Sequence, residues 1–373
     1  MKIDLRSKKR IVIKIGSSIL INKDSVNKRW LRAFSNDVHW LSKQGFEIVI
    51  VSSGAVALGK KSLKKLPEIV DVVTKKAAAA IGQIQLMSHY QEFFRKKRVN
   101  VAQILLTSQD CDERKRYLSS KNTINKLLEN KIIPIINEND SLVAEGTKIG
   151  DNDRLAARIS QMVSADILIL LSDVNGLYNK NPNVNKDARF ISEVTKITKN
   201  IEKFASNATS DVGTGGMKTK VMAAKMLEDT NCATIIASGI KNHSLKDIFK
   251  AKTNFTIFYS NKKSSINSRK KWLSGFLNIN GKVIINKCAK EALLTGNASL
   301  LPVGVVKIVG SFKKKDAILI EDEHKNHVAT GVSNYSSIES KKIILKNSVQ
   351  IKKILGASAK KELVHIDNLV LND

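Results

Sequence analysis

Lys14 stands inside an apolar stretch, IVIKIGSSIL at residues 11–20, that has the composition of a buried strand. A buried ammonium group costs free energy unless it is paired or takes part in chemistry. After Ile15 the stretch breaks into Gly16-Ser17-Ser18, and glycine lets a backbone approach an anion closely. Two explanations are open: a solvated lysine on an ordinary edge strand, or a strand that delivers a cation to a site.

A second lysine, Lys220, ends the glycine-rich segment VGTGGMKTK at residues 212–220. Its glycines permit backbone N–H groups to approach an anion at the start of a helix. At about 100° per residue, Lys220 falls on the apolar face of that helix, whereas Lys218 and Lys225 project the opposite way. This spacing favours a phosphate ligand, and the alternative is a lysine whose stem covers apolar surface.

Two polar clusters stand close together, INEND at residues 136–140 and Asp151-Asn152-Asp153. Asp and Asn are preferred residues at a helix N-cap, which explains one of the three in the second cluster. The others are available to bind a substrate ammonium group or to position lysines by charge pairing.

Two other motifs point to different chemistry. The segment GAVALGKK at residues 54–61 nearly matches a P-loop, but Lys61 stands where a Ser or Thr hydroxyl must reach the metal. His324 and His327 lie in a polar run, which favours a solvated loop over a metal site. No residue is assigned to a metal.

The elements that position these residues follow an alternating pattern up to about residue 260. The strands, apolar on both faces, alternate with helical spacing, which predicts a mainly parallel sheet covered by helices on both sides, a three-layer αβα sandwich. Ligands of such sheets collect at the carboxyl ends of the strands. The predicted strands are residues 11–15, 46–51, 101–106, 132–136, 166–171 and 233–237.

Five segments rich in glycine or small polar residues occupy positions where such a sheet binds its ligand. Any one of them is explained by turn formation alone. Their recurrence predicts one common site. The segments are Gly16-Ser17-Ser18, Ser52-Ser53-Gly54, 136–140, Ser172-Asp173 and 212–220.

After residue 258 the composition changes. A polar, basic stretch predicts a linker at 259–277, and short glycine-bounded strands then predict a small β-rich domain at 278–358 with a helix near Lys287–Leu294. Residues 359–373 are left as a C-terminal tail.

Composition limits the class of protein. The chain has 373 residues and 42% hydrophobic residues, and its three cysteines are scattered, so a disordered chain and a disulfide framework are both disfavoured. No apolar run is long enough to cross a bilayer, and Lys14 interrupts the stretch that imitates a signal peptide, so a cytoplasmic location is expected. The net charge of +29 comes from 51 Lys and 12 Arg and is spread over the chain, which leaves open a compositional bias or a basic binding face.

Together these segments resemble the amino-acid kinase family, in the order and spacing of its motifs over residues 10–258. The matching stretches are IKIGSSIL, VSSGAVALG, VNVAQILLT, IINENDSL, KIGDNDRLAA, LLSDVNGLY and GTGGMKTK. The C-terminal part resembles a PUA domain, a pairing found in the branch of the family that phosphorylates the side-chain carboxylate of L-glutamate on the way to proline.

The resemblance implies a role for each matching residue. Lys14 and Lys220 would contact the transferred phosphate from two sides, and Asp153 would hold both lysines, so these three are the expected catalytic residues. Ser53, Asp140 and Asn152 would bind glutamate. ATP would be bound by Lys14, Ser172, Asp173, Thr214, Gly215, Gly216, Met217, Lys218, Thr219 and Lys220.

The resemblance also implies ATP and Mg²⁺ as cofactors, a homo-oligomer (dimer or tetramer), and proline as an inhibitor. RNA binding by the PUA-like domain is a further expectation, and no membrane partner is expected. Two alternatives stay open: a related kinase that acts on another carboxylate or phosphate, and an RNA-binding or RNA-modifying factor.

Overall fold

The chain forms two compact units, residues 1–263 and 264–373. The computed structural model describes residues 9–22, 25–63, 71–142, 151–182, 184–207, 216–260, 279–295 and 298–371. Of the predicted linker, all but residues 259 and 260 lies outside this part, so its bounds stay a prediction.

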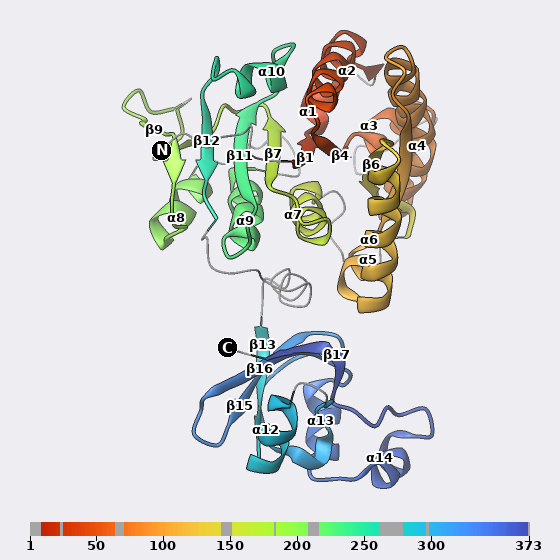
Figure 1. Ribbon diagram of the computed structural model, residues 1–373, viewed down its shortest axis with the longest axis vertical. Helices are drawn as coiled ribbons and strands as arrows, with labels where there is room; N and C mark the ends of the chain where they lie inside the picture. The colour runs from red at the N-terminus through yellow and green to blue at the C-terminus, as the bar shows by residue number, and fades with distance from the viewer. Residues whose placement is uncertain are drawn as a thin grey trace. The chain divides into compact units, whose positions relative to one another are not determined.

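An eight-stranded sheet forms the centre of the first unit (Figure 1). All its neighbouring strands pair in parallel except β11 with β12. The strand order places the ends of five consecutive strands, from β11 to β6, side by side at one edge. In sheet order the strands are β10 (Glu193–Val194), β12 (Phe255–Phe258), β11 (Ala233–Ser238), β7 (Ile167–Ser172), β1 (Arg10–Ile15), β4 (Glu47–Val51), β6 (Ile133–Glu138) and β5 (Val101–Leu106).

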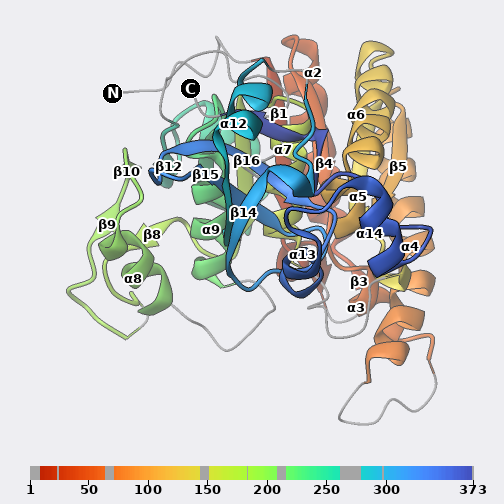
Figure 2. The ribbon, with the colours of Figure 1, turned by 90° about the horizontal axis from the view of Figure 1, so that it is seen from below.

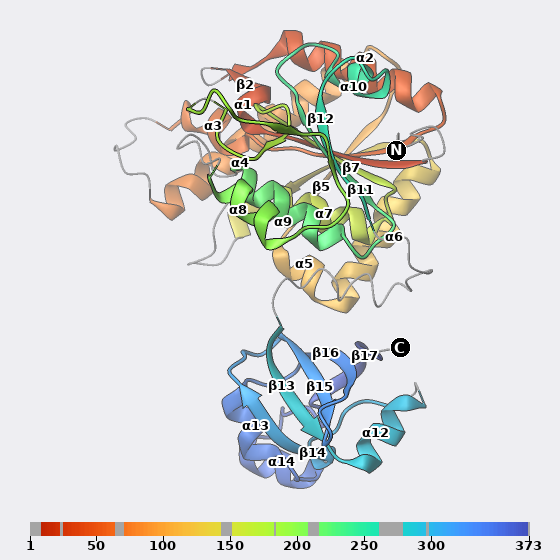
Figure 3. The same ribbon diagram turned by 90° about the vertical axis from the view of Figure 1, so that its left-hand side faces the viewer.

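Helices cover both faces of this sheet, as Figure 3 shows for α2 and α10 on one side and α7, α8 and α9 on the other. This confirms the predicted three-layer αβα sandwich with a mainly parallel sheet. The helices are α1 (Ser17–Leu20), α2 (Lys28–Lys43), α3 (Ala55–Lys60), α4 (Val72–Arg95), α5 (Ser108–Asp112), α6 (Arg114–Glu129), the 3₁₀ turn η2 (Asp140–Leu142), α7 (Asn152–Met162), α8 (Lys199–Asn207), α9 (Met217–Leu227) and α10 (Ser244–Phe249). Two small hairpins pair β2 (Ile21–Asn22) with β3 (Ser25–Val26) and β8 (Leu177–Tyr178) with β9 (Phe190–Ile191).

The alternation of side chains along β1 explains where Lys14 points. Ile11, Ile13 and Ile15 belong to the core cluster that also contains the buried faces of α2 and α4. Val12 and Lys14 therefore project from the opposite face of the sheet, toward the layer that contains α7 and α9.

Close packing of α3 on α4 fixes the position of the chain that follows β4. A Cβ atom at Gly82 would lie 1.9 Å from the carbonyl oxygen of Ala55, and one at Gly59 would lie 1.8 Å from that of Ala78. Gly59, which imitated a P-loop glycine, therefore serves a helix–helix contact. The turn before α3 needs Gly54, whose φ is +108°.

In its described residues, the second unit has a five-stranded sheet, three α-helices and its own apolar core. The short helices α13 and α14 lie next to each other (Figure 2). In sheet order its strands are β14 (Val305–Gly310), β13 (Ile279–Ile285), β15 (Ala317–Asp322), β16 (His327–Ser333) and β17 (Val364–Leu371), and its helices are α12 (Lys287–Leu294), the 3₁₀ turn η3 (Pro302–Gly304), α13 (Ser337–Ile343) and α14 (Ser348–Leu355).

One segment differs from the sequence analysis. Residues 359–373 were expected to be a tail, whereas Val364–Leu371 form β17 and pair with β16. The apolar residues Leu363, Val364 and Leu369 are buried in the core of this unit, but the polar residues between them hide the alternation.

None of the helices in the described part of the chain combines the length and the apolar character that crossing a membrane requires.

Candidate active site

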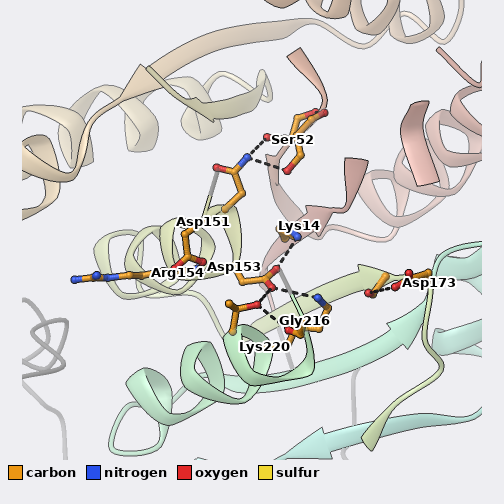
Figure 4. A network of polar contacts seen from close by, with 12 residues as sticks. Lys14, Ser52, Asp151, Asp153, Arg154, Asp173, Gly216 and Lys220 are labelled. Atoms are coloured by element: carbon orange, nitrogen blue, oxygen red, sulfur yellow. Dashed lines mark hydrogen bonds and ion pairs between the residues drawn. The ribbon is translucent and has the colours of Figure 1, made fainter. Parts of the chain in front are cut away.

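Two lysines from different elements meet at one buried carboxylate. The Nζ atom of Lys14, from β1, lies 2.6 Å from Oδ1 of Asp153, and the Nζ atom of Lys220, from α9, lies 3.2 Å from Oδ2. Asp153 stands in the first turn of α7, and Thr219 donates its hydroxyl to the same Oδ2 at 2.7 Å. Figure 4 shows both lysines pointing toward Asp153, with Ser52 beyond Lys14 and Asp173 on the side of Lys220.

The three charged side chains of this cluster are buried, and burial and their mutual charges shift the pKa values of Asp153 and Lys220. Lys14, Asp153 and Lys220 are 7%, 2% and 3% exposed. Burial alone would raise the pKa of the Asp153 carboxyl, but the charges of Lys14 and Lys220 more than offset it and bring the pKa to about 2. Burial lowers the pKa of Lys220, the charge of Lys14 lowers it further, and Asp153 opposes both. Two cations share one anion, so the cluster has a net positive charge that suits an incoming anion.

The first turn of α7 explains why three polar residues stand together there. Asp151 is the N-cap and accepts the N–H of Arg154 at 3.3 Å. Asn152 and Asp153 are not used as caps, and both are buried. Because one residue is enough to cap the helix, Asn152 and Asp153 can point into the interior, as the sequence analysis inferred.

Asn152 links α7 to the turn after β4. Its side-chain amide donates to the Ser53 hydroxyl at 2.8 Å, to the Ser52 carbonyl at 3.0 Å and to Oδ1 of Asn137 at 3.1 Å. Asn137 in turn donates to Gln83 of α4 at 2.8 Å. The buried Oδ1 of Asn152 has no hydrogen-bond partner within the described residues, so this acceptor is available to a ligand.

Asp140 adds a second acceptor near the same turn. It lies in η2, which packs against α4, and its Oδ1 atom is buried without a hydrogen-bond partner in the described ranges. Burial, and then the charge of Glu138, raise the pKa of Asp140 to about 7. An unpaired buried carboxyl oxygen and an unpaired buried amide oxygen each suit a ligand that brings a cationic donor, such as an ammonium group.

A cavity of about 770 Å³ opens beside Lys220. It lies at the ends of β7 and β11 and at the start of α9, where the sheet edge and a helix N-terminus come together. It is large enough for a nucleotide. Its lining includes Ser172, Asp173, Asn175, Tyr178, Asn181, Gly216, Met217, Lys220, Lys241, Ser244, Asp247, Lys252 and Asn254.

The structure brings most of the predicted residues to these three places, the cation cluster, the turn after β4 and the cavity. Ser172 donates its hydroxyl to Asp173 at 2.9 Å at the cavity edge. Lys218 is exposed, as its helical phase predicted, and does not line the cavity. Thr214 and Gly215 lie outside the described residues.

Sequence reasoning missed the residues that support this arrangement. Asn137 and Gln83 are buried polar residues whose role shows only when β6, α4 and α7 are assembled. An asparagine at the end of the apolar strand IIPII was the one available signal for Asn137. Thr219 was expected among the residues that bind ATP, whereas in the structure its hydroxyl donates to Asp153.

No group of three or more His, Cys, Asp or Glu side chains suited to a metal ion occurs within the described ranges. His324 lies exposed in the turn between β15 and β16, as expected, whereas His327 is the first residue of strand β16 and not part of a loop. The His327 ring is exposed and contacts Thr330 at 3.0 Å.

Comparisons with known proteins agree with this geometry. Residues 9–238 match the amino acid kinase family, and residues 281–355 match the PUA domain. The chain is 43% identical to the glutamate 5-kinase of Pelagibacter ubique, over 98% of this chain and 99% of that protein. It is 40% identical to the glutamate 5-kinase of Dictyoglomus turgidum, over 98% of both chains.

Among solved structures, the carbamate kinase from Giardia lamblia bound to AMP-PNP matches 69% of this chain and 100% of its own. The two are 14% identical with a TM-score of 0.50, a similarity that concerns the fold alone.

Proposed function

The chain belongs to the amino acid kinase family, and from this premise we propose that it transfers the γ-phosphoryl group of ATP to the side-chain carboxylate of L-glutamate. The products are L-glutamyl 5-phosphate and ADP, and the reaction is the first step of proline biosynthesis. The substrate follows from the full-length similarity to glutamate 5-kinases. One geometric observation supports the reaction: two buried ammonium groups on one carboxylate, Asp153, beside a nucleotide-sized cavity.

The acceptor needs no general base. The side-chain carboxylate of glutamate has a pKa of about 4.3, so it is an anion at neutral pH. One of its oxygens attacks the γ-phosphorus, a new O–P bond forms, and the bond to the β–γ bridging oxygen breaks with its electron pair leaving on ADP. No proton has to move in this step.

Charge is therefore the main obstacle, because an anionic nucleophile meets an anionic phosphoryl group. Lys14 and Lys220 would stabilise the equatorial oxygens from two sides, and Asp153 would hold both ammonium groups in place before ATP arrives. The donors are fixed by burial and by the carboxylate, so little reorganisation is required at the moment of transfer.

The unpaired acceptors near the turn after β4 suit the amino-acid end of glutamate. Oδ1 of Asn152 and the carboxylate of Asp140 would accept from its ammonium group, and Ser53 stands in the same network. The cavity would hold the nucleotide, with Ser172, Asp173, Gly216, Met217 and Lys220 along its wall.

Mg²⁺ is proposed as the partner of the ATP phosphates. Magnesium in kinases takes one or two carboxylates and fills its other positions with phosphate oxygens and water, so it needs no cage of side chains. Asp173 and Asp247 both line the cavity, and Asp153 already pairs with two lysines. Asp173 is the carboxylate proposed to hold the ion, because its charge also acts on Lys220. When bound, the ion neutralises charge on the phosphates.

Family membership also leads us to propose a homo-oligomer, a dimer or tetramer, inhibition by proline, and a cytoplasmic location. Gel filtration with light scattering and a proline titration of the activity test the first two. RNA binding by the C-terminal unit stays a prediction.

Trapping the product tests the proposed reaction. The protein is incubated with ATP, Mg²⁺ and L-glutamate in the presence of hydroxylamine, which converts an acyl phosphate into a stable hydroxamate. We expect glutamyl hydroxamate and ADP in equal amounts, and neither when a chelator removes Mg²⁺. ADP without hydroxamate would mean that water or another group is the acceptor.

A further inference from the structure

A buried carboxylate far along the chain from the catalytic residues contacts the wall of the nucleotide cavity. Asp37 lies in the middle of α2 and is 1% exposed. Its Oδ1 atom lies 2.7 Å from Nδ1 of His243, and its Oδ2 atom accepts the backbone N–H of Lys246 at 3.2 Å. Burying an ionised acid costs free energy unless the acid is paired and hydrogen-bonded, so these contacts offset the cost of its burial.

Those contacts fix the start of α10. His243 is the N-cap residue of α10, but its own side chain caps no N–H of the helix. Its φ of +64° places it in the left-handed region. The carboxylate of Asp37 therefore takes the role of the missing cap from outside, because it accepts an N–H of the first turn.

Three further contacts tie α2 to the same segment. The indole N–H of Trp30 donates to the Gly239 carbonyl at 2.6 Å. The Trp40 ring packs against Phe249 with 6.4 Å between centroids, and the ammonium group of Lys246 lies 5.8 Å from the Trp40 ring. Figures 1 and 3 show α10 beside α2 on the face of the sheet opposite α7 and α9.

The segment that α2 holds is also a wall of the cavity. Ser244 and Asp247 line it from α10, Lys241 lines it from the turn before this helix, and Lys252 and Asn254 line it from the loop that follows. Asp37 itself does not line the cavity. A shift of α10 would move Ser244 and Asp247 directly, and Lys241 and Lys252 lie in the segments joined to its two ends.

We propose that Asp37 is a positioning residue for nucleotide binding: from α2 it caps α10 and, with His243, sets the position of the cavity wall. The inference rests on the proposed use of this cavity for ATP. Burial raises the pKa of the Asp37 carboxyl, and the contacts with His243 and Lys246 lower it only in part, so the acid is held at a cost to stability.

The test separates the two substrates. For Asp37→Ala we expect the KM for ATP, and the Kd for the ATP analogue AMP-PNP, to rise by about tenfold, the loss expected for hydrogen bonds to a charged group. The KM for glutamate should change less than twofold. Asp37→Asn should be milder, because it keeps an oxygen for the Lys246 N–H.

His243→Asn removes the ring without straining the backbone, because asparagine tolerates the left-handed region. If His243 acts through Asp37, the double variant with Asp37→Ala should bind AMP-PNP no more weakly than Asp37→Ala alone. If Asp37→Ala does not fold, the single variants Asp37→Asn and His243→Asn keep the test valid.

Val38→Ala is the matched control, because Val38 is the next residue of α2, is fully buried in the core and does not line the cavity. It should lower Tm and leave the KM for ATP unchanged. Asp37 variants that lower Tm in the same way with an unchanged KM for ATP would overturn the inference. A native protein that does not bind AMP-PNP would overturn the proposed function itself.

Discussion

Replacing Lys220 by methionine tests the role of the cation cluster while sparing the fold. Methionine keeps most of the side-chain volume and removes the charge together with the ammonium donors, one of which bonds Asp153. Asp153 stays satisfied, because Lys14 still pairs with its Oδ1 atom and the Thr219 hydroxyl still donates to Oδ2. We therefore expect little change in Tm.

The loss of activity should be large. At an effective dielectric constant of about 20, an ammonium group about 3 Å from a unit negative charge contributes roughly 5–6 kcal/mol. Only the part that grows between ground state and transition state accelerates the reaction. For one such donor that part is about 2.7–4 kcal/mol, so kcat should fall by about 10²–10³-fold.

Lys218→Met is the matched control. Lys218 lies two residues away on the same helix and is exposed, so its variant should keep kcat within about twofold. Both variants are assayed by ADP release with saturating ATP and glutamate, and their Tm values are compared. A Lys220→Met protein that keeps near-normal kcat would refute the assignment, and so would equal losses in the two variants.

Three other changes test the account at different places. As pH falls through about 7, Asp140 takes a proton and loses the charge proposed to bind the ammonium group, so the KM for glutamate should rise. Asp140→Asn should abolish this pH dependence of the KM. The pKa of Asp140 in the folded protein lies above its ordinary value of 3.8, so the ionised carboxylate destabilises the fold. The variant should therefore raise Tm more at pH 8 than at pH 4. Gly82→Ala would place a methyl group 1.9 Å from the Ala55 carbonyl oxygen, so it should cost about 1–3 kcal/mol of stability and raise the KM for glutamate, whereas Ala80→Ser on the exposed side of α4 should do neither. Removal of residues 264–373 should leave measurable kinase activity in a folded protein, because every described residue of the proposed site lies in the first unit; an inactive but folded truncation would place part of the site in the second unit.

Patterns of neighbouring residues predicted the strands of the central sheet and the direction in which several site residues point. The apolar strands and the helical phase of Lys220 follow from periodicity, and the meeting of loops at one edge follows from parallel strands. The inward direction of Asn152 and Asp153 followed from the fact that a helix needs only one N-cap.

Long-range contacts were beyond the sequence. The link from Asn137 to Gln83 joins residues 54 positions apart, and that from Asp37 to His243 joins residues 206 apart. Each of these residues is polar, and nothing in its neighbouring sequence identifies its distant partner. The strand β17 was missed because polar residues stand between its buried apolar residues, and such a mixed sequence is also typical of a solvated tail.

Acceptor specificity is the most direct test of the central claim. ADP release from ATP and Mg²⁺ is measured with L-glutamate, L-aspartate and N-acetyl-L-glutamate in separate reactions. The account predicts turnover with L-glutamate alone, because the acceptors near the turn after β4 suit a free ammonium group at one fixed distance from the transferred phosphate. Turnover with N-acetyl-L-glutamate, or silence with all three from a protein that binds ATP, would contradict it.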